Sequence, residues 1–285
     1  MQRIEIIECP RDAMQGIKQW IPTAQKIRYA QSLLKVGFDV LDVWSFVSPK
    51  AIPQMQDTTA VLAGLDRSES QTQLLTIVAN ERGARSACVQ AEVDCLGYPF
   101  SISENFQMRN THKTIESSQM LLDRLLDLSI QNNKDLVVYL SMGFGNPYGD
   151  PWSPEIVAQW IDVLASKGVK TISLSDTVGA ASSETIGQLF SLIIPQFSNL
   201  TIGAHLHVKA IDALEKIDLA YQHGCRRFDV AIKGYGGCPM AKDELIGNMP
   251  TEKILTYCTT YKIPHKLNTL HFEVSYNEAL RTFPS

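Results

Sequence analysis

Short apolar runs and longer amphipathic stretches alternate along the 285 residues of the chain. Runs rich in β-branched and aliphatic residues are typical of strands, whereas apolar positions spaced three to four residues apart are typical of helices. Eight such runs predict strands, at residues 4–8, 40–45, 74–78, 92–97, 136–141, 171–175, 200–207 and 227–232. Their near-continuous apolar character indicates a parallel sheet whose faces are covered by helices.

Capping residues mark the ends of the helices expected between these strands. Ser153 before Pro154 and Glu155 is a typical helix start, because serine caps the first turn and proline fits it. Glycine is a typical residue after the last turn. The other predicted starts are Thr23, Thr114, Ser182 and Thr251, and the predicted ends are Gly37, Gly168 and Gly224.

Eight strand–helix units in one domain predict a closed (β/α)₈ barrel, known as a TIM barrel, over about residues 1–263. A doubly wound open sheet is the alternative. No G-x-G-x-x-G follows the first strand, which disfavours a dinucleotide-binding sheet. Residues 264–285 then predict a short C-terminal extension, either an extra helix or a flap packed outside the barrel.

Composition narrows the class of protein without naming a function. Hydrophobic residues make up 45% and charged residues 20%, which is ordinary for a globular domain. The net charge of −4 offers no basic face for nucleic acid, and no apolar run is long enough to cross a bilayer. The six cysteines form no CxxC pair, and no signal peptide precedes the first strand. We therefore expect reduced thiols and a cytoplasmic location.

Polar residues gather where the strands end, which is the end of such a barrel that carries the active site. His205 and His207 are two residues apart in the seventh strand, so both side chains point to the same face. With Asp12 available after the first strand, the pair favours a metal site. The alternative is two half-buried histidines bonded to backbone. Nitrogen and oxygen ligands together favour Mg²⁺ or Mn²⁺ over Zn²⁺.

Four further residues at the strand ends are candidates for chemistry. Cys238 follows glycines in the segment GYGGCP, which predicts a mobile lid carrying a reactive thiol, or else an incidental cysteine. Arg11 is placed to bind an anionic oxygen, or forms an ordinary ion pair with Asp12. Asp42 and Asp176 are either partners of the metal ligands or helix N-caps.

Several segments, in order along the chain, resemble one family. They are PRDAMQ at 10–15, SFVSPK at 45–50 with PQM at 53–55, SENF at 103–106 with Asn110, SLSDTVG at 173–179, GGCP at 236–239, and GN at 247–248 with TE at 251–252. The chain resembles the 3-hydroxy-3-methylglutaryl-CoA lyases, within the metal-dependent TIM-barrel lyases and aldolases. The resemblance runs from about residue 4 to about residue 260.

This resemblance implies a reaction and a role for each candidate. Arg11 would stabilise the thioester enolate oxygen, and Cys238 would act as general acid/base, with Asp42 and Asp176 in the active site. The reaction would be retro-Claisen cleavage of 3-hydroxy-3-methylglutaryl-CoA to acetyl-CoA and acetoacetate. We expect an acyl-CoA substrate and a homodimer or other homo-oligomer as partners. The implied ligands of a divalent cation are Asp12, His205, His207 and Asn248.

The chain departs from the family pattern in four places. Ala13 replaces a glycine, and the segment VKAID at 208–212 lacks the usual aspartate after the second histidine. Lys233 replaces a small residue, and the segment KDE at 242–244 is charged. These changes leave two alternatives open: a related aldolase or synthase acting on another hydroxyacyl-CoA or on a 2-oxo acid, and a non-catalytic barrel used for binding.

Overall fold

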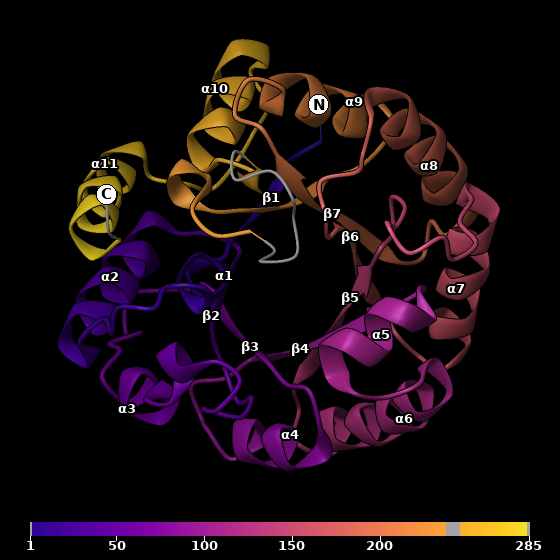
Figure 1. The fold of residues 1–285 in the computed structure, drawn as a ribbon. Helices are drawn as coiled ribbons and strands as arrows, with labels where there is room; N and C mark the ends of the chain where they lie inside the picture. Colours follow the sequence, from indigo (N-terminus) through magenta and orange to yellow (C-terminus); the bar gives the residue numbers. More distant parts are fainter. Residues whose placement is uncertain (1, 238–245, 284–285) are drawn as a thin grey trace.

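Parallel strands close into a barrel in the computed structural model, which describes residues 2–237 and 246–283. The strands are neighbours in chain order from β1 to β8, β8 pairs with β1, and β6 pairs with β7. Figure 1 shows the helices as a ring around these strands. The prediction of a (β/α)₈ barrel is confirmed, and the open doubly wound alternative is excluded. The parallel strands are β1 (Glu5–Glu8), β2 (Val40–Ser45), β3 (Gln73–Ile77), β4 (Cys95–Ser101), β5 (Asp135–Ser141), β6 (Thr171–Asp176), β7 (Thr201–Val208) and β8 (Arg227–Val230).

The helices begin and end near the predicted caps. The side chains of Thr114, Ser153 and Ser182 each accept a hydrogen bond from the backbone of the first turn of a helix. The α-helices are α1 (Pro10–Gln15), α2 (Thr23–Val36), α3 (Thr58–Ala63), α4 (Glu81–Cys88), α5 (Glu104–Thr111), α6 (Ile115–Gln131), α7 (Pro154–Ser166), α8 (Ser183–Gln196), α9 (Ala213–Gln222), α10 (Thr251–Tyr261) and α11 (Thr269–Thr282). Two 3₁₀ helices, η1 (Pro53–Met55) and η2 (Ile232–Gly234), complete the set. None of the helices in the described part of the chain is long and apolar enough to cross a membrane.

The C-terminal extension is a helix, one of the two forms expected. Helix α11 packs against α2 on the outside of the barrel (Figure 1). Strand β9 (Gly247–Asn248), which the sequence pattern does not predict, pairs antiparallel with β7.

The fourth strand lies further along the chain than predicted, at Cys95–Ser101 rather than at residues 92–97. Gly97 is the predicted end of the strand, yet a Cβ there would lie 2.6 Å from Ile77 Cδ1, so the position inside the strand requires glycine for packing. Pro99 is tolerated because β3 pairs with β4 only as far as Gly97.

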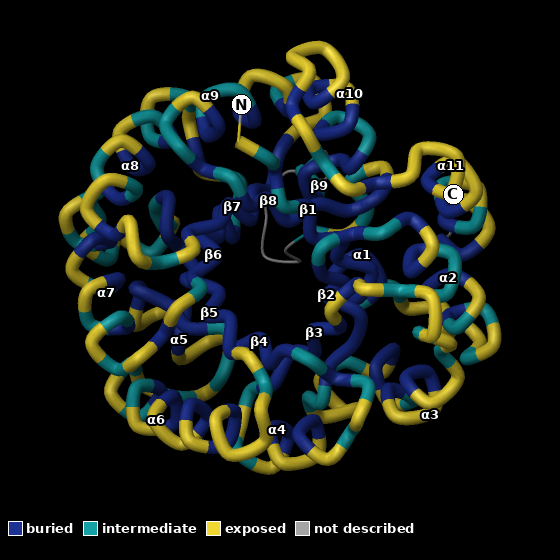
Figure 2. Tube along the Cα trace, turned by 180° about the vertical axis from the view of Figure 1, so that it is seen from behind, coloured by how far each residue is buried: buried dark blue, intermediate teal, exposed yellow. Residues whose placement is uncertain are grey.

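Two layers of apolar side chains hold the barrel. A large cluster fills the space between strands and helices, and a smaller cluster including Ile7, Leu75 and Tyr139 lies on the other face of the strands, inside the barrel. Figure 2, seen from behind, shows buried strands at the centre and exposed outer faces on the helices. The thiols of Cys9, Cys88, Cys95, Cys225 and Cys258 are buried, as expected for packed cysteines.

Glu8 is a fully buried carboxyl at the end of β1 that ties this strand to the segment after β8. One oxygen accepts from Ile232 N at 2.8 Å, and the other accepts from Thr251 Oγ1 at 2.6 Å. Burial disfavours the carboxylate and raises the pKa of Glu8 to about 8, although both hydrogen bonds oppose the change. Glu8 therefore fixes both the start of η2 and the start of α10.

Replacing Glu8 by glutamine is expected to change how stability depends on pH. The carboxyl has a pKa of about 8 in the folded chain and 4.5 as its ordinary value, so the unfolded chain releases this proton first as pH rises. The unaltered chain therefore loses stability as pH rises from the lower to the higher of these two values. A glutamine has no such proton to release, so Glu8→Gln does not show this loss. We expect the difference in the free energy of unfolding, Glu8→Gln minus the unaltered chain, to increase as pH rises through that range.

Urea unfolding at about pH 5, 7 and 9 measures this difference. Glu5→Gln, on the same strand but with a side chain 43% exposed, is the matched control. The same difference at every pH would show that Glu8 does not titrate in this window.

Candidate metal centre

Three buried side chains converge at the barrel mouth, the end at which the carboxyl ends of the parallel strands meet. Asp12 lies in α1, which begins directly after β1 with Pro10 in its first turn. His205 and His207 lie on β7. One ligand atom from each residue lies within 4.8 Å of the others, so the three could hold a metal ion. The structure thus brings together the histidine pair and the aspartate that the sequence singled out.

The ring of His207 uses one nitrogen, Nδ1, in a hydrogen bond, which leaves the other, Nε2, to bind an ion. Its Nδ1 lies 3.1 Å from the carbonyl oxygen of Thr177, and because a carbonyl can only accept, Nδ1 carries the proton. Nε2 therefore has a lone pair, and it is buried without a hydrogen-bond partner within residues 2–237 and 246–283. It lies 4.0 Å from Asp12 Oδ2. The alternative of backbone-bonded histidines explains Nδ1 but not Nε2, which fits a cation.

His205 is oriented by a residue that the sequence reasoning missed. Its Nδ1 lies 3.2 Å from Asp229 Oδ2, and Ser173 Oγ donates to the same oxygen at 2.7 Å. With Nδ1 engaged, Nε2 is the nitrogen available to an ion. A carboxylate behind a metal-binding imidazole is a common arrangement, since it fixes the orientation of the ring. The available signal was a pair of charged residues, Arg227 and Asp229, two apart in a predicted strand whose other residues are apolar.

Asn248 reaches the site through the short strand β9. The antiparallel pairing places Asn248 opposite His207. Its Nδ2 donates to Asp12 Oδ2 at 2.7 Å and to the carbonyl oxygen of Tyr235 at 2.8 Å. Both N–H groups are thereby used, so the amide oxygen is the atom left for a cation.

The glycines before Cys238 are packed tightly rather than free. Gly236 has φ +85°, and a Cβ on it would lie 2.6 Å from the carbonyl oxygen of Asp12. Only glycine lets the chain pass this close to α1 in that conformation. In this structure the segment is packed against α1 at Gly236, and the interpretation of the segment as a mobile lid stays a prediction. Cys238 and the charged residues 242–244 lie outside the described residues.

Arg11 is held by two carboxylates. Its Nε donates to Asp42 Oδ1 at 3.1 Å and Nη2 donates to Asp42 Oδ2, while Nη1 donates to Asp12 Oδ1 at 2.8 Å and to Gln15 Oε1 at 3.0 Å. Asp42 lies within β2 and precedes no helix, so the N-cap alternative is wrong for it. It is a partner of Arg11 rather than of a histidine.

The two carboxyls beside Arg11 have opposite pKa shifts. Burial would raise the pKa of Asp12, but Arg11, the two histidines and the hydrogen bond from Asn248 lower it to about 2. Burial is the largest effect at Asp42, and it raises the pKa to about 6 even though Arg11 opposes it. Asp12 is thus the carboxylate that stays ionised and available to a cation.

Asp176 shapes the turn between β6 and α8. Its oxygens accept from Ala180 N at 2.7 Å and from Ala181 N at 3.2 Å, while Ser182 is the N-cap of α8. The N-cap alternative is therefore wrong here too. Burial raises the pKa of Asp176 to about 6.

The structure describes three of the four places where the chain departs from the family pattern. Lys233 has a left-handed backbone, with φ 57°, and its N–H donates to Glu252 Oε2 at 3.0 Å. Asp212 stands at the N-cap of α9 but makes no side-chain cap bond. Ala13 is buried, and Gly236 packs on its backbone.

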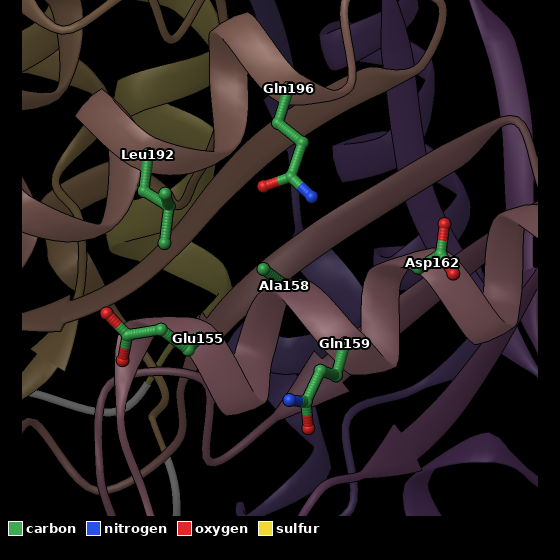
Figure 3. A pocket seen from close by; sticks show the side chains of 6 residues that line it. All are labelled: Glu155, Ala158, Gln159, Asp162, Leu192 and Gln196. Carbon is green, nitrogen blue, oxygen red and sulfur yellow. The ribbon is translucent and has the colours of Figure 1, made fainter.

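A surface groove of about 310 Å³ shares no residue with this centre. It lies between α7 and α8, on the outer wall of the barrel, as Figure 3 shows at close range. Its lining residues are Glu155, Ala158, Gln159, Asp162, Leu192 and Gln196.

The fold and the site together define a (β/α)₈-barrel protein with a buried Asp/His/His group that could bind a metal ion at its mouth. The model of the HMGL-like family matches residues 3–275. The chain belongs to the HMGL-like family.

Named relatives agree with this assignment. The chain is 31% identical to the hydroxymethylglutaryl-CoA lyase YngG of Bacillus subtilis over 246 residues, which cover 86% of this chain and 81% of that protein. It is 30% identical to the mitochondrial hydroxymethylglutaryl-CoA lyase of Homo sapiens, over 89% of this chain and 78% of that protein. The crystal structure of the Bacillus subtilis HMG-CoA lyase superposes with a TM-score of 0.92 at 28% identity, covering 100% of this chain and 96% of that one.

Removing the His207 side chain is expected to abolish tight metal binding. The change His207→Ala deletes the buried Nε2 that has no protein partner, so Mn²⁺ affinity should fall by more than about 100-fold, beyond the range seen for outer-shell partners of metal ligands. Isothermal titration with Mn²⁺ measures the effect. His271→Ala, at an exposed position on α11, is the matched control. Unchanged Mn²⁺ affinity in His207→Ala would remove His207 from the ligand set.

Proposed function

We propose that this chain is a carbon–carbon lyase that cleaves 3-hydroxy-3-methylglutaryl-CoA to acetyl-CoA and acetoacetate. The observation that carries the proposal is the buried Nε2 of His207, which has no hydrogen-bond partner among the described residues and lies beside Asp12 at the mouth of a barrel of the HMGL-like family. The names of the relatives support the substrate. The related aldolase, the synthase and the non-catalytic barrel have no such support.

The proposed ligand set is Asp12, His205, His207 and the amide oxygen of Asn248, with Mg²⁺ or Mn²⁺ as the ion. Two neutral imidazoles, one carboxylate and one amide suit these cations better than Zn²⁺, which more often recruits a thiolate. Bound there, such an ion supplies a Lewis acid that makes the tertiary alcohol of the substrate easier to deprotonate. The four side chains would hold that ion at the barrel mouth.

Arg11 is the proposed group that takes up charge as the carbon–carbon bond breaks. The departing thioester fragment becomes an enolate, whose oxygen needs a nearby donor. A guanidinium has five N–H groups. Among the described residues, Nε donates once, Nη1 twice and Nη2 once, so one N–H on Nη2 has no protein acceptor there and is proposed to donate to the substrate. Asp42 holds the guanidinium in place, so the donor needs little rearrangement when charge develops.

The remaining steps concern protons. The proton that leaves the alcohol must reach the enolate carbon, which becomes the methyl group of acetyl-CoA. On the strength of the resemblance we assign both steps to Cys238, which accepts the proton as general base and then donates it as general acid. Asp176 is proposed to stay in the active site as the carboxyl that shapes the β6–α8 turn beside His205. Assembly into a homodimer or other homo-oligomer, and a cytoplasmic location, stay predictions.

Purified protein given 3-hydroxy-3-methylglutaryl-CoA and Mn²⁺ under reducing conditions is expected to release acetoacetate and acetyl-CoA in equal amounts. A chelator should stop the reaction, and added Mg²⁺ or Mn²⁺ should restore it, because the proposed chemistry needs the ion. Coupled detection of acetoacetate measures the rate. Absence of product from protein shown to bind Mn²⁺ would overturn the proposed substrate while leaving the metal centre standing.

Cys238→Ala is expected to lower kcat by about 100-fold or more, since general acid–base groups contribute about 10²–10⁴-fold. Mn²⁺ affinity should stay nearly unchanged, because the thiol is outside the proposed ligand set. Steady-state kinetics and Mn²⁺ titration test both statements. The control is Cys88→Ala, whose thiol lies in α4. Full turnover in Cys238→Ala would exclude the thiol as the proton donor.

A further inference from the structure

An arginine is buried inside the barrel directly behind the metal centre. Arg227 and Asp229 are two apart on β8, whereas Phe228 and Val230 pack in the outer cluster, so the charged pair points inward. Arg227 is 4% exposed and Asp229 is 2% exposed. A Cβ on the neighbouring Gly203 would lie 3.0 Å from Arg227 Cδ, so the glycine makes room for the arginine stem.

The two oxygens of Asp229 face different partners. Oδ2 receives Ser173 Oγ and lies against His205 Nδ1. Oδ1 lies 3.9 Å from Arg227 Nη2 and has no hydrogen-bond partner in the part of the chain that the structure describes. Arg227 Nε and Nη2 are also without hydrogen-bond partners there. The attraction between Arg227 and Asp229 is therefore an ionic one that acts on the oxygen turned away from the histidine.

Packing alone does not account for this arginine. Removing a guanidinium from water is strongly unfavourable, and an apolar side chain of similar volume would fill the same space without that penalty. The burial of Arg227 is better explained by an interaction between its charge and a neighbouring charged group. The charged neighbour that shares its strand and its face is Asp229, which in turn contacts His205.

We propose that Arg227 is a positioning residue for the metal centre. Its guanidinium draws Oδ1 of Asp229 into the barrel, which fixes the carboxylate plane so that Oδ2 meets His205 Nδ1. The ring of His205 is thereby held with Nε2 directed to the site formed with Asp12 and His207. Arg227 touches neither substrate nor ion. The inference rests on the proposed metal centre and extends it to the barrel interior.

The test compares four single variants and one double variant by Mn²⁺ affinity and by the NMR signal of the hydrogen-bonded Nδ1 proton of His205 in metal-free protein. Arg227→Met keeps the volume and removes the charge, and Arg227→Lys keeps the charge. Asp229→Asn weakens the contact with His205 directly. Arg226→Met is the matched control, because Arg226 is the adjacent arginine but bonds backbone carbonyls of Tyr221 and Cys225.

We expect Arg227→Met to weaken Mn²⁺ binding about 10-fold, at the lower end of the effects of outer-shell partners, and to broaden or remove the His205 proton signal. Arg227→Lys should lose less, and Arg226→Met should match the unaltered chain. In the Asp229→Asn background, Arg227→Met should add little, because Arg227 acts through Asp229. If Arg227→Met does not fold, Arg227→Gln, which also removes the charge, carries the test.

Two results would overturn the proposal: unchanged Mn²⁺ affinity with an intact His205 proton signal in a folded Arg227 variant that lacks the charge, or full additivity of the Arg227 and Asp229 changes. A loss of thermal stability alone, without either readout moving, would show an ordinary structural ion pair. Failure of the unaltered chain to bind Mn²⁺ would instead overturn the metal centre, and the positioning role with it.

Discussion

Two carboxylates, Asp12 and Asp42, are buried within reach of one guanidinium, that of Arg11, and a buried carboxylate without a partner is unstable as an anion. The resulting pair of contacts decides the geometry of the mouth. Asp42 anchors the arginine from inside β2, and Asp12 sits on the opposite side, in α1. Because Arg11 also lowers the pKa of Asp12, the same interaction keeps the Asp12 carboxylate ionised beside the two histidines.

Around this ionic centre, backbone packing supplies the remaining precision. Gly236 lies against the backbone of Asp12 in α1, and β9, which carries Asn248, pairs with β7, which carries the two histidines. Glu8 anchors the two ends of that segment. The metal centre is thus built less from loops than from short elements fixed by close contact and buried hydrogen bonds, which suits a site that must hold its ligands within tight limits.

Much of this arrangement was accessible from the sequence. The alternation of apolar runs predicts the eight parallel strands, and the spacing of His205 and His207 places both rings on one face. What the pattern could not reveal depends on contacts between distant parts of the chain. In the sequence, Asp229 and Arg227 look like interruptions in an apolar strand. Only the fold shows that Asp229 contacts His205 and that Arg227 lies beside Asp229. Gly97 is typical of a strand end, yet it is required by side chains of β3.

The candidate ligands come from opposite ends of the chain: Asp12 follows the first strand, and the other three lie on or after the seventh. Strands β1 and β8 pair at the seam where the barrel closes. An ion held by this set would bridge the seam. It would act as a cross-link between the N-terminal and the C-terminal part of the barrel. Since such a site is absent from an unfolded chain, the free energy of binding would stabilise closure itself. A barrel that has lost its ion would then be expected to open first at this seam.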